Sequence, residues 1–281
     1  MQIGIKDGQK WGDQHYLKLR SFGFNCYDFN MSNINGLPYI YEGKEFEDYL
    51  KNQKRLADEA GITIWQAHGP WRGPHEATPE DRAEQLEIMT RSVQAASILG
   101  AKYWVVHPIM PFGLHDLKTG HAEQTKELAL EFMKKLSAVG KREGVIVCVE
   151  NMPFSEYSLS SPTSIAELVA ELNDPYFAMC LDTGHANVCA DWLTPAETVR
   201  KFRQYVKMLH VHDNNGEFDE HLHPFSGTID WKDFSSALRE VNFSGSVSLE
   251  CCPPENLPED IYEDMYALYC RMAKAIATGN F

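Results

Sequence analysis

The chain is short of positive charge. Its 26 Lys and Arg residues stand against 40 Asp and Glu residues, and the formal net charge at pH 7 is −14. Proteins that follow a nucleic-acid backbone gain affinity from clustered Lys and Arg, so this composition disfavours a nucleic-acid partner. The chain also lacks a run of about 18 apolar residues, and its start, MQIGIKDGQ, lacks the basic flank and apolar stretch of a secretion signal. We therefore expect a soluble cytoplasmic protein with no membrane partner.

Other familiar signals are missing as well. The seven cysteines form no CxxC pair, and Cys148 and Cys180 lie inside apolar runs, where a thiol acts as a small apolar side chain. No Gly-rich phosphate-binding loop is evident, so nothing in the sequence supports a phosphorylated ligand. The chain has no linker, no internal repeat and no low-complexity tract. Its 281 residues, 43% of them hydrophobic, therefore predict one domain over 1–281 with one large core.

What the chain does have is a regular alternation of short apolar runs and longer amphipathic segments. This order is typical of a parallel sheet covered by helices. The predicted strands are residues 3–5, 25–29, 63–68, 103–107, 145–150, 177–182, 206–212 and 246–250. Apolar residues at three- and four-residue spacing predict helices over 44–60, 79–99, 124–141 and 258–277. Eight such units indicate an α/β fold of the (β/α)8 TIM-barrel type.

Turn chemistry marks several helix ends. Helix starts are indicated where a hydroxyl residue precedes proline, at Thr78, Ser161 and Thr194. Helix stops are indicated by Gly61, Gly100 and Gly144. The segment after residue 212 is a long polar connection.

Four of the predicted strands close with a side chain that can bind a metal ion. These are Glu150 in VCVEN, Asp182 in MCLDTGH, His210 in MLHVHDN and Glu250 in VSLEC. The active site of a TIM barrel lies at the carboxyl ends of its strands, so these side chains are expected to meet around one open divalent-metal site. Three carboxylates and one imidazole suit Mn²⁺ or Mg²⁺, and further histidines favour Zn²⁺, with Co²⁺ also compatible.

A second set of polar side chains lies at strand ends or in the adjoining loops. It comprises His68, His107, His185, His212, Asp219 and His221. Because His210 and His212 alternate on one predicted strand, periodicity alone does not choose between them. Each histidine has a plainer interpretation as a hydrogen-bonded polar side chain, and Glu150 and Glu250 have one as partners of basic residues inside the barrel. Trp71, just past His68, is placed where a pocket wall is expected.

Taken together, the motifs resemble those of the xylose isomerase-like barrel superfamily, which includes the ketose 3-epimerases, hydroxypyruvate isomerase and endonuclease IV. The motifs that carry the resemblance are HGPW at His68, HP at His107, ENMP at Glu150, DTGHAN at Asp182, HVHDN at His210, DEH at Asp219 and LEC at Glu250. The resemblance spans essentially the whole chain. It implies the TIM-barrel fold and an enzyme that acts on a small carbohydrate.

The epimerase branch of that superfamily implies roles for particular residues. By similarity, Glu150, Asp182, His210 and Glu250 would hold the catalytic metal, with His212 as the second choice for the histidine. Glu150 and Glu250 would also act as acid and base, moving a proton next to a carbonyl through an enediolate. His185 and Glu156 would contact substrate hydroxyls.

Two other functions remain as alternatives. The DNA-repair branch uses three zinc ions, and its additional ligands are matched by His68, His107, His185, Asp219 and His221. The segments around the ligands differ from that branch, and the acidity of the chain disfavours a DNA surface. The barrel could also bind sugar or metal without catalysis. Gly216 stands where ketose epimerases tend to place a substrate-binding arginine, so the choice between isomerisation and epimerisation stays open, as does homo-oligomer formation.

Overall fold

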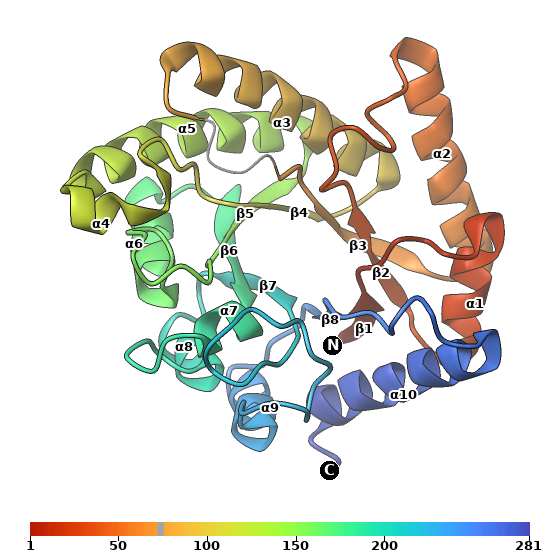
Figure 1. Cartoon of the computed structure of the whole chain (residues 1–281). Helices are drawn as coiled ribbons and strands as arrows, with labels where there is room; N and C mark the ends of the chain where they lie inside the picture. Colours follow the sequence, from red (N-terminus) through yellow and green to blue (C-terminus); the bar gives the residue numbers. More distant parts are fainter. Residues whose placement is uncertain (72–75) are drawn as a thin grey trace.

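Within the part of the chain that the structure describes, eight parallel strands form a closed ring with helices around it (Figure 1). The computed structural model describes residues 1–71 and 76–281. The strands are β1 (Gln2–Ile5), β2 (Cys26–Asn30), β3 (Thr63–His68), β4 (Tyr103–Val106), β5 (Ile146–Glu150), β6 (Phe177–Asp182), β7 (Val206–His210) and β8 (Ser246–Leu249). Strands β2 to β7 pair in chain order, β1 pairs with β8, and single bridges from Lys6 to Asp28 and from Val211 to Leu249 join the two sheets. The predicted (β/α)8 barrel is confirmed.

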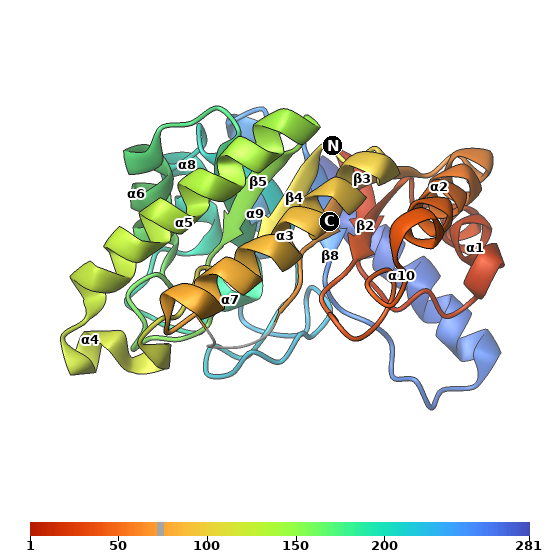
Figure 2. The ribbon, with the colours of Figure 1, turned by 90° about the horizontal axis from the view of Figure 1, so that it is seen from above.

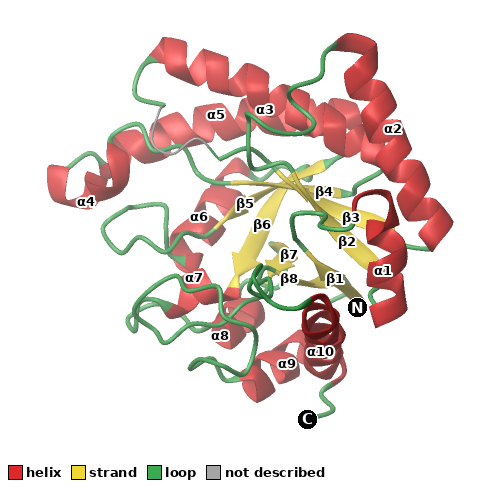
Figure 3. Cartoon of the chain, turned by 45° about the vertical axis from the view of Figure 1, so that its right-hand side comes forward, coloured by secondary structure: helices red, strands yellow, loops and turns green. Residues whose placement is uncertain are grey.

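The helices cover the outer face of the strands (Figure 3). They are α1 (His15–Phe22), α2 (Gly43–Ala60), α3 (Pro79–Leu99), α4 (Asp116–Thr119), α5 (Ala122–Glu143), α6 (Pro162–Leu172), α7 (Thr183–Asn187), α8 (Pro195–Lys201), α9 (Trp231–Glu240) and α10 (Glu259–Thr278). Helices α3 and α5 run side by side along the outside (Figure 2). No helix in the described ranges is both long and apolar enough to cross a bilayer.

The predicted helix boundaries are confirmed where turn chemistry indicated them. Thr78, Ser161 and Thr194 each accept a hydrogen bond from a backbone N–H in the first turn of the helix that follows. The three predicted stops adopt the left-handed conformation at the ends of α2, α3 and α5. Helices α1 and α9 were not predicted. For α9 the missed signal is Asp230, whose carboxylate accepts from the backbone N–H groups of Lys232 and Asp233.

Three predicted strands extend past the carboxyl ends of the observed strands. His107 and Glu250 come directly after β4 and β8, and His212 lies two residues beyond β7. At His212 the hydroxyl of Thr183 makes the hydrogen bonds that a neighbouring strand would otherwise make. It accepts from the backbone N–H of His212 and donates to the carbonyl oxygen of His212. Residues beyond the strands therefore turn toward the mouth of the barrel.

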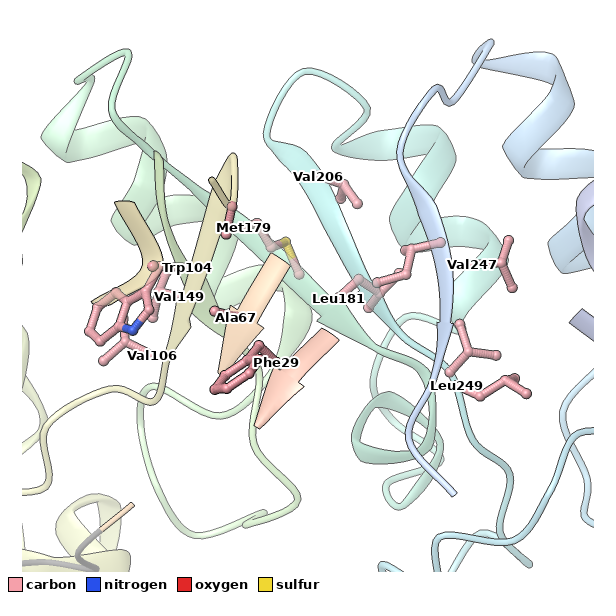
Figure 4. Close-up of a cluster of buried hydrophobic side chains, with 14 of the residues drawn as sticks. Phe29, Ala67, Trp104, Val106, Val149, Met179, Leu181, Val206, Val247 and Leu249 are labelled. Carbon is pink, nitrogen blue, oxygen red and sulfur yellow. The ribbon is translucent and has the colours of Figure 1, made fainter. Parts of the chain in front are cut away.

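The side chains that point outward from the strands form the main apolar core against the helices. Figure 4 shows part of it, with Phe29, Trp104, Val149 and Leu181 among the buried side chains. A smaller apolar cluster fills the barrel interior and includes Tyr103, Val105, Cys148, Ala178, Cys180 and Met208. Both cysteines are fully buried, as expected for thiols acting as small apolar groups.

The period of two along each strand connects this interior cluster to the polar mouth. Two residues after Val105, Cys148, Cys180 and Met208 come His107, Glu150, Asp182 and His210. An apolar layer therefore fills the middle of the barrel, and the next inward layer, toward the carboxyl ends, is polar and titratable.

A buried carboxylate ties together the elements near the junction of β1 and β8. Asp7 follows β1 and accepts hydrogen bonds from the hydroxyls of Tyr27 (2.9 Å) and Tyr266 (2.9 Å). Its Oδ1 also lies 3.0 Å from Nε2 of His15. Burial alone would raise the pKa of Asp7, but the contact with His15 outweighs burial and holds that pKa below its usual value. Asp7 thereby links α1, β2 and α10.

Candidate active site

The four predicted metal ligands meet at the mouth of the barrel. Glu150 and Asp182 end β5 and β6, His210 ends β7, and Glu250 follows β8. One ligand atom from each of the four side chains lies within 4.8 Å of the other three. Nδ1 of His210 is 2.6 Å from Oε1 of Glu150 and 2.7 Å from Oε2 of Glu250. We call this set the four-ligand group.

The side chains of the four-ligand group suit a divalent cation. Oδ2 of Asp182 is buried without a hydrogen-bond partner within the described ranges. The buried Oε2 atoms of Glu150 and Glu250 make no hydrogen bond of normal geometry there, although histidine nitrogens lie 3.1 Å and 2.7 Å away. Buried polar atoms without partners cost free energy. A cation would satisfy all three oxygens, and one nitrogen with three carboxylates is a donor set for Mn²⁺, Mg²⁺, Co²⁺ or Zn²⁺.

A second group of ligand atoms shares Glu150. His68 and His107 bring their Nε2 atoms to 3.7 Å and 3.1 Å from Oε2 of Glu150, and the three side chains satisfy the same mutual distance limit of 4.8 Å. Nδ1 of His68 lies 2.7 Å from the carbonyl oxygen of Gly69, to which it donates as the N–H nitrogen of a neutral ring. That hydrogen bond leaves Nε2 of His68 free to face Glu150.

A third group surrounds Asp219. The Nε2 atoms of His185, His221 and His212 lie 3.3 Å, 3.2 Å and 3.7 Å from the Asp219 carboxylate. Nδ1 of His185 and Nδ1 of His221 each lie 2.8 Å from a backbone carbonyl oxygen. The structure therefore separates the pair that periodicity left undecided, with His210 in the four-ligand group and His212 in the third group.

The loop that carries Asp219 and His221 is fixed by a carboxylate that the sequence analysis did not single out. Asp213 is fully buried and accepts from the indole N–H of Trp231 (2.8 Å) and the backbone N–H of Gly227 (3.0 Å). Its backbone also pairs with Leu222 in both directions. The two ends of the polar connection after β7 are thereby joined beside the mouth of the barrel.

Glycine in the DTGH motif makes room for the third group. A Cβ atom added at Gly184 would lie 2.0 Å from Cε1 and 2.3 Å from Nδ1 of the His212 ring. We expect Gly184→Ala to displace this ring, lower stability by about 1 to 3 kcal/mol as an overpacked site does, and weaken any metal bound by the third group. Thermal unfolding and metal content measure both effects.

Gly8→Ala is the matched control, because a Cβ atom there meets nothing within 4 Å. Equal behaviour of the two alanine variants would contradict this account of Gly184.

Two further charged side chains lie at the mouth and were missed. Lys6, directly after β1, forms an ion pair with Glu250. The plainer interpretation of Glu250, as the partner of a basic residue inside the barrel, therefore holds for its contact with Lys6. Asp28, in β2, is fully buried and lies 3.0 Å from Nε2 of His210. Both follow the inward-facing alternation of β1 and β2, whose outward residues Ile5 and Phe29 lie in the main apolar core, so the period of two would have identified them.

The electrostatics of the mouth keep its two glutamates ionised. Burial raises the pKa of Glu150, but His210 and His107 outweigh burial and hold it well below its usual value. Burial also raises the pKa of Glu250, but His210 and Lys6 outweigh burial and hold that pKa well below its usual value. Burial lowers the pKa of His185, but the charges of Asp182 and Asp219 outweigh burial and raise that pKa to about 10. Such a strongly negative site attracts protons or cations.

A cavity of about 250 Å³ opens above these groups. Its lining includes Lys6, Ser32, His68, Trp71, His107, Met152, Pro153, Phe154, His185, Asp219, His221 and Glu250. The Trp71 ring packs edge-on against His107, with 4.6 Å between ring centroids. Trp71 therefore lies in the wall of the cavity, beside charged groups that converge from several strands.

Glu156 is one predicted site residue that the structure does not bring to this cavity. Its carboxylate pairs with Lys118 and with His115, and its side chain is 35% exposed. The segment after β5 turns toward α4, where the carbonyl oxygen of Glu156 accepts from the backbone N–H of Leu117. A spacing of six residues from Glu150 therefore does not return Glu156 to the mouth.

The chain belongs to the xylose isomerase-like TIM barrel family, whose model matches residues 17–269. An uncharacterized protein of Methanocaldococcus jannaschii is 26% identical over 78% of this chain and 75% of its own. A D-psicose 3-epimerase of Ruminiclostridium cellulolyticum is 24% identical over 86% of this chain and 80% of its own. A probable endonuclease 4 of Mycoplasma mobile is 21% identical over 82% of this chain and 80% of its own.

The fold is also that of a solved structure of D-psicose 3-epimerase with D-tagatose from Clostridium cellulolyticum H10. The two structures superpose with a TM-score of 0.78 at 19% sequence identity, covering 98% of this chain and 99% of the other. The family and the barrel fold expected from the sequence motifs are both confirmed.

Proposed function

We propose that this protein is a divalent-metal-dependent isomerase or epimerase of a small carbohydrate. The observation that carries the proposal is the convergence of Glu150 and Glu250 on His210, with Asp182 beside them, next to a cavity that Glu250 lines. The names of the D-psicose 3-epimerase relatives support a sugar as substrate. A cavity of about 250 Å³ suits a small ligand rather than a polymer.

The two glutamates would perform the proton transfer. The reaction breaks a C–H bond next to a carbonyl; the proton passes to a carboxylate oxygen, and the electron pair moves onto the carbonyl oxygen. Glu150 and Glu250 approach His210 from different strands, β5 and the end of β8. One carboxylate would take the proton and the other would return a proton to the same or the adjacent carbon. Their lowered pKa values keep them ionised and able to accept it.

Glu150, Asp182, His210 and Glu250 would hold the cation, which when bound supplies Lewis-acid stabilisation of the negative charge that develops on the substrate oxygens. The proposed ion is Mn²⁺ or Zn²⁺, and Mg²⁺ or Co²⁺ also suit the donor set. Trp71 and Phe154 would cover the apolar face of the sugar, and His185 would contact a hydroxyl from the opposite wall.

A second candidate function is a zinc-dependent nuclease that cuts at abasic sites. The observation that favours it is that ligand atoms gather around Asp219 and around His68 and His107 as well as in the four-ligand group, with Glu150 shared between the last two. The relatives named as probable endonuclease 4 point the same way. The net charge of −14 argues against it, because a phosphate backbone would be repelled.

Two measurements on one preparation test both functions. Sugars incubated with the protein in D₂O should take up deuterium next to the carbonyl, and chelation of metal should stop the uptake. A duplex with one abasic site should stay uncut. Cleavage of the duplex without deuterium uptake would replace the proposed function by the nuclease. Tight metal binding with neither reaction, over a panel of free ketoses and aldoses, would indicate a binding protein instead.

A further inference from the structure

The ring of His210 lies between carboxylates on both edges. Its Nδ1 edge faces Glu150 (2.6 Å) and Glu250 (2.7 Å) in the four-ligand group. On the opposite edge, Nε2 lies 3.0 Å from Oδ2 of Asp28. His210 and Asp28 are both fully buried, so water does not compete for either edge of the ring.

The carboxylate of Asp28 is itself held in place. Its Oδ2 accepts a hydrogen bond of 2.6 Å from the side-chain amide of Gln66 and a longer one of 3.4 Å from the hydroxyl of Ser248. The ring of His68 stacks on His210 with 5.4 Å between centroids and 9° between planes. The hydrogen bonds fix the position of Asp28, and the stacking fixes the plane of the imidazole.

This arrangement determines which nitrogen of His210 carries the proton once a cation is bound. A neutral imidazole has one N–H donor and one nitrogen with a lone pair. A cation between Glu150 and Glu250 takes the lone pair of Nδ1, and Asp28 has only acceptor atoms when ionised, so the N–H then belongs on Nε2. Nδ1 then points to the place where the carboxylates of Glu150 and Glu250 converge. Partners of this kind orient metal-binding histidines and strengthen their binding.

We infer that Asp28 is a positioning residue for the proposed metal site, which fixes His210 in the Nε2–H form and so directs Nδ1 toward a divalent cation. Asp28 lies behind His210, outside the residues that line the cavity. It therefore acts through His210 and has no contact with substrate. The inference rests on the proposed function only in assuming that the four-ligand group binds a cation.

The test compares Asp28→Asn and Asp28→Ala with the wild type. Protein stripped by a chelator is titrated with Zn²⁺, and ¹⁵N spectra of histidine-labelled protein report the tautomer of His210, assigned through a His210→Gln variant. We expect Asp28→Ala to weaken Zn²⁺ binding by about 10- to 100-fold, with a smaller loss in Asp28→Asn, which keeps an acceptor oxygen. The Nε2–H signal of His210 should lose its dominance in the alanine variant.

Asp116→Asn is the matched control, because Asp116 is also a fully buried carboxylate, bonded to the backbone N–H of Ser158 instead of a histidine. It should leave Zn²⁺ affinity and the His210 tautomer unchanged. Zn²⁺ affinity within twofold of wild type in the Asp28 variants would overturn the inference, as would an equal loss in Asp116→Asn. If the alanine variant does not fold, the asparagine variant decides. A wild type that binds no divalent cation would instead remove the proposed metal site.

Discussion

Replacing Glu150 or Glu250 by glutamine should lower solvent-proton exchange into a sugar substrate by about 10²- to 10⁴-fold, the range that positioned acids and bases contribute. The amide keeps nearly the same shape but cannot accept the proton. Deuterium uptake, measured by mass spectrometry or NMR at saturating metal, gives the rate. Removal of one charge from a crowded carboxylate cluster should leave the fold largely intact.

The control for these variants is Glu131→Gln, a carboxylate on the outer face of α5 that pairs with Lys135. Metal content must be measured in every variant, since both glutamates are also proposed ligands. A variant that retains the metal but loses exchange identifies proton transfer as the function of that glutamate. Wild-type exchange rates in both glutamine variants would refute the mechanism.

Asp7→Asn should destabilise the protein by about 1 to 3 kcal/mol, the cost of leaving buried hydrogen-bonding groups without a partner. The amide cannot replace the carboxylate against His15 and two tyrosine hydroxyls together. Denaturant unfolding measures the free energy. Tyr266→Phe should cost less, about 0.5 to 1.5 kcal/mol, because it removes one neutral hydrogen-bond donor and leaves the carboxylate paired.

The pH dependence of stability provides a second check on Asp7. Since the folded-state pKa of Asp7 is lowered, its contribution is fully present above the unfolded-state pKa of about 3.9. That contribution is lost as the pH falls from there through the folded-state value. The Asp7→Asn variant should show a flatter stability profile in this acid range. An unfolding free energy within 1 kcal/mol of wild type, with an unchanged acid profile, would contradict the role of Asp7.

Much of the fold follows from local rules that the sequence displays directly. Residues 63–68 and 177–182 were predicted as strands with the bounds that β3 and β6 have, because apolar runs of this length are bounded by clear turn residues. The helix start at Pro79 was equally clear, since Thr78 caps the helix through its side chain. Short strands buried on both faces leave little ambiguity once glycine and proline mark the turns.

The candidate site was predictable where a side chain lies at a strand end. Glu150, Asp182 and His210 end their strands, and the barrel geometry brings them together. The side chains that contact these residues were harder to predict from the sequence. Lys6 and Asp28 lie on equivalent positions of β1 and β2, but their contacts with Glu250 and His210 join residues far apart in the chain. Such contacts depend on barrel closure, which no local pattern encodes.

Loop residues were the least predictable. The substrate contact of Glu156 was implied by the family resemblance, which places a glutamate six residues after the first ligand, and in an irregular loop such spacing does not fix where a side chain points. Asp213, by contrast, was not predicted as a site residue, yet it orders the connection after β7 through hydrogen bonds from Gly227 and Trp231. Its role depends on residues 14 and 18 positions away, so no local pattern indicates it.

Glu150 belongs both to the four-ligand group and to the group with His68 and His107, and this position has a thermodynamic consequence. A carboxylate that serves two cations cannot bind one without altering its charge distribution toward the other. If cations bind both the His68 and His107 group and the four-ligand group, the two occupancies are linked, and each changes the affinity of the other by the same factor. Filling the mouth of this barrel would then be a coupled equilibrium in which the shared Glu150 on β5 takes part.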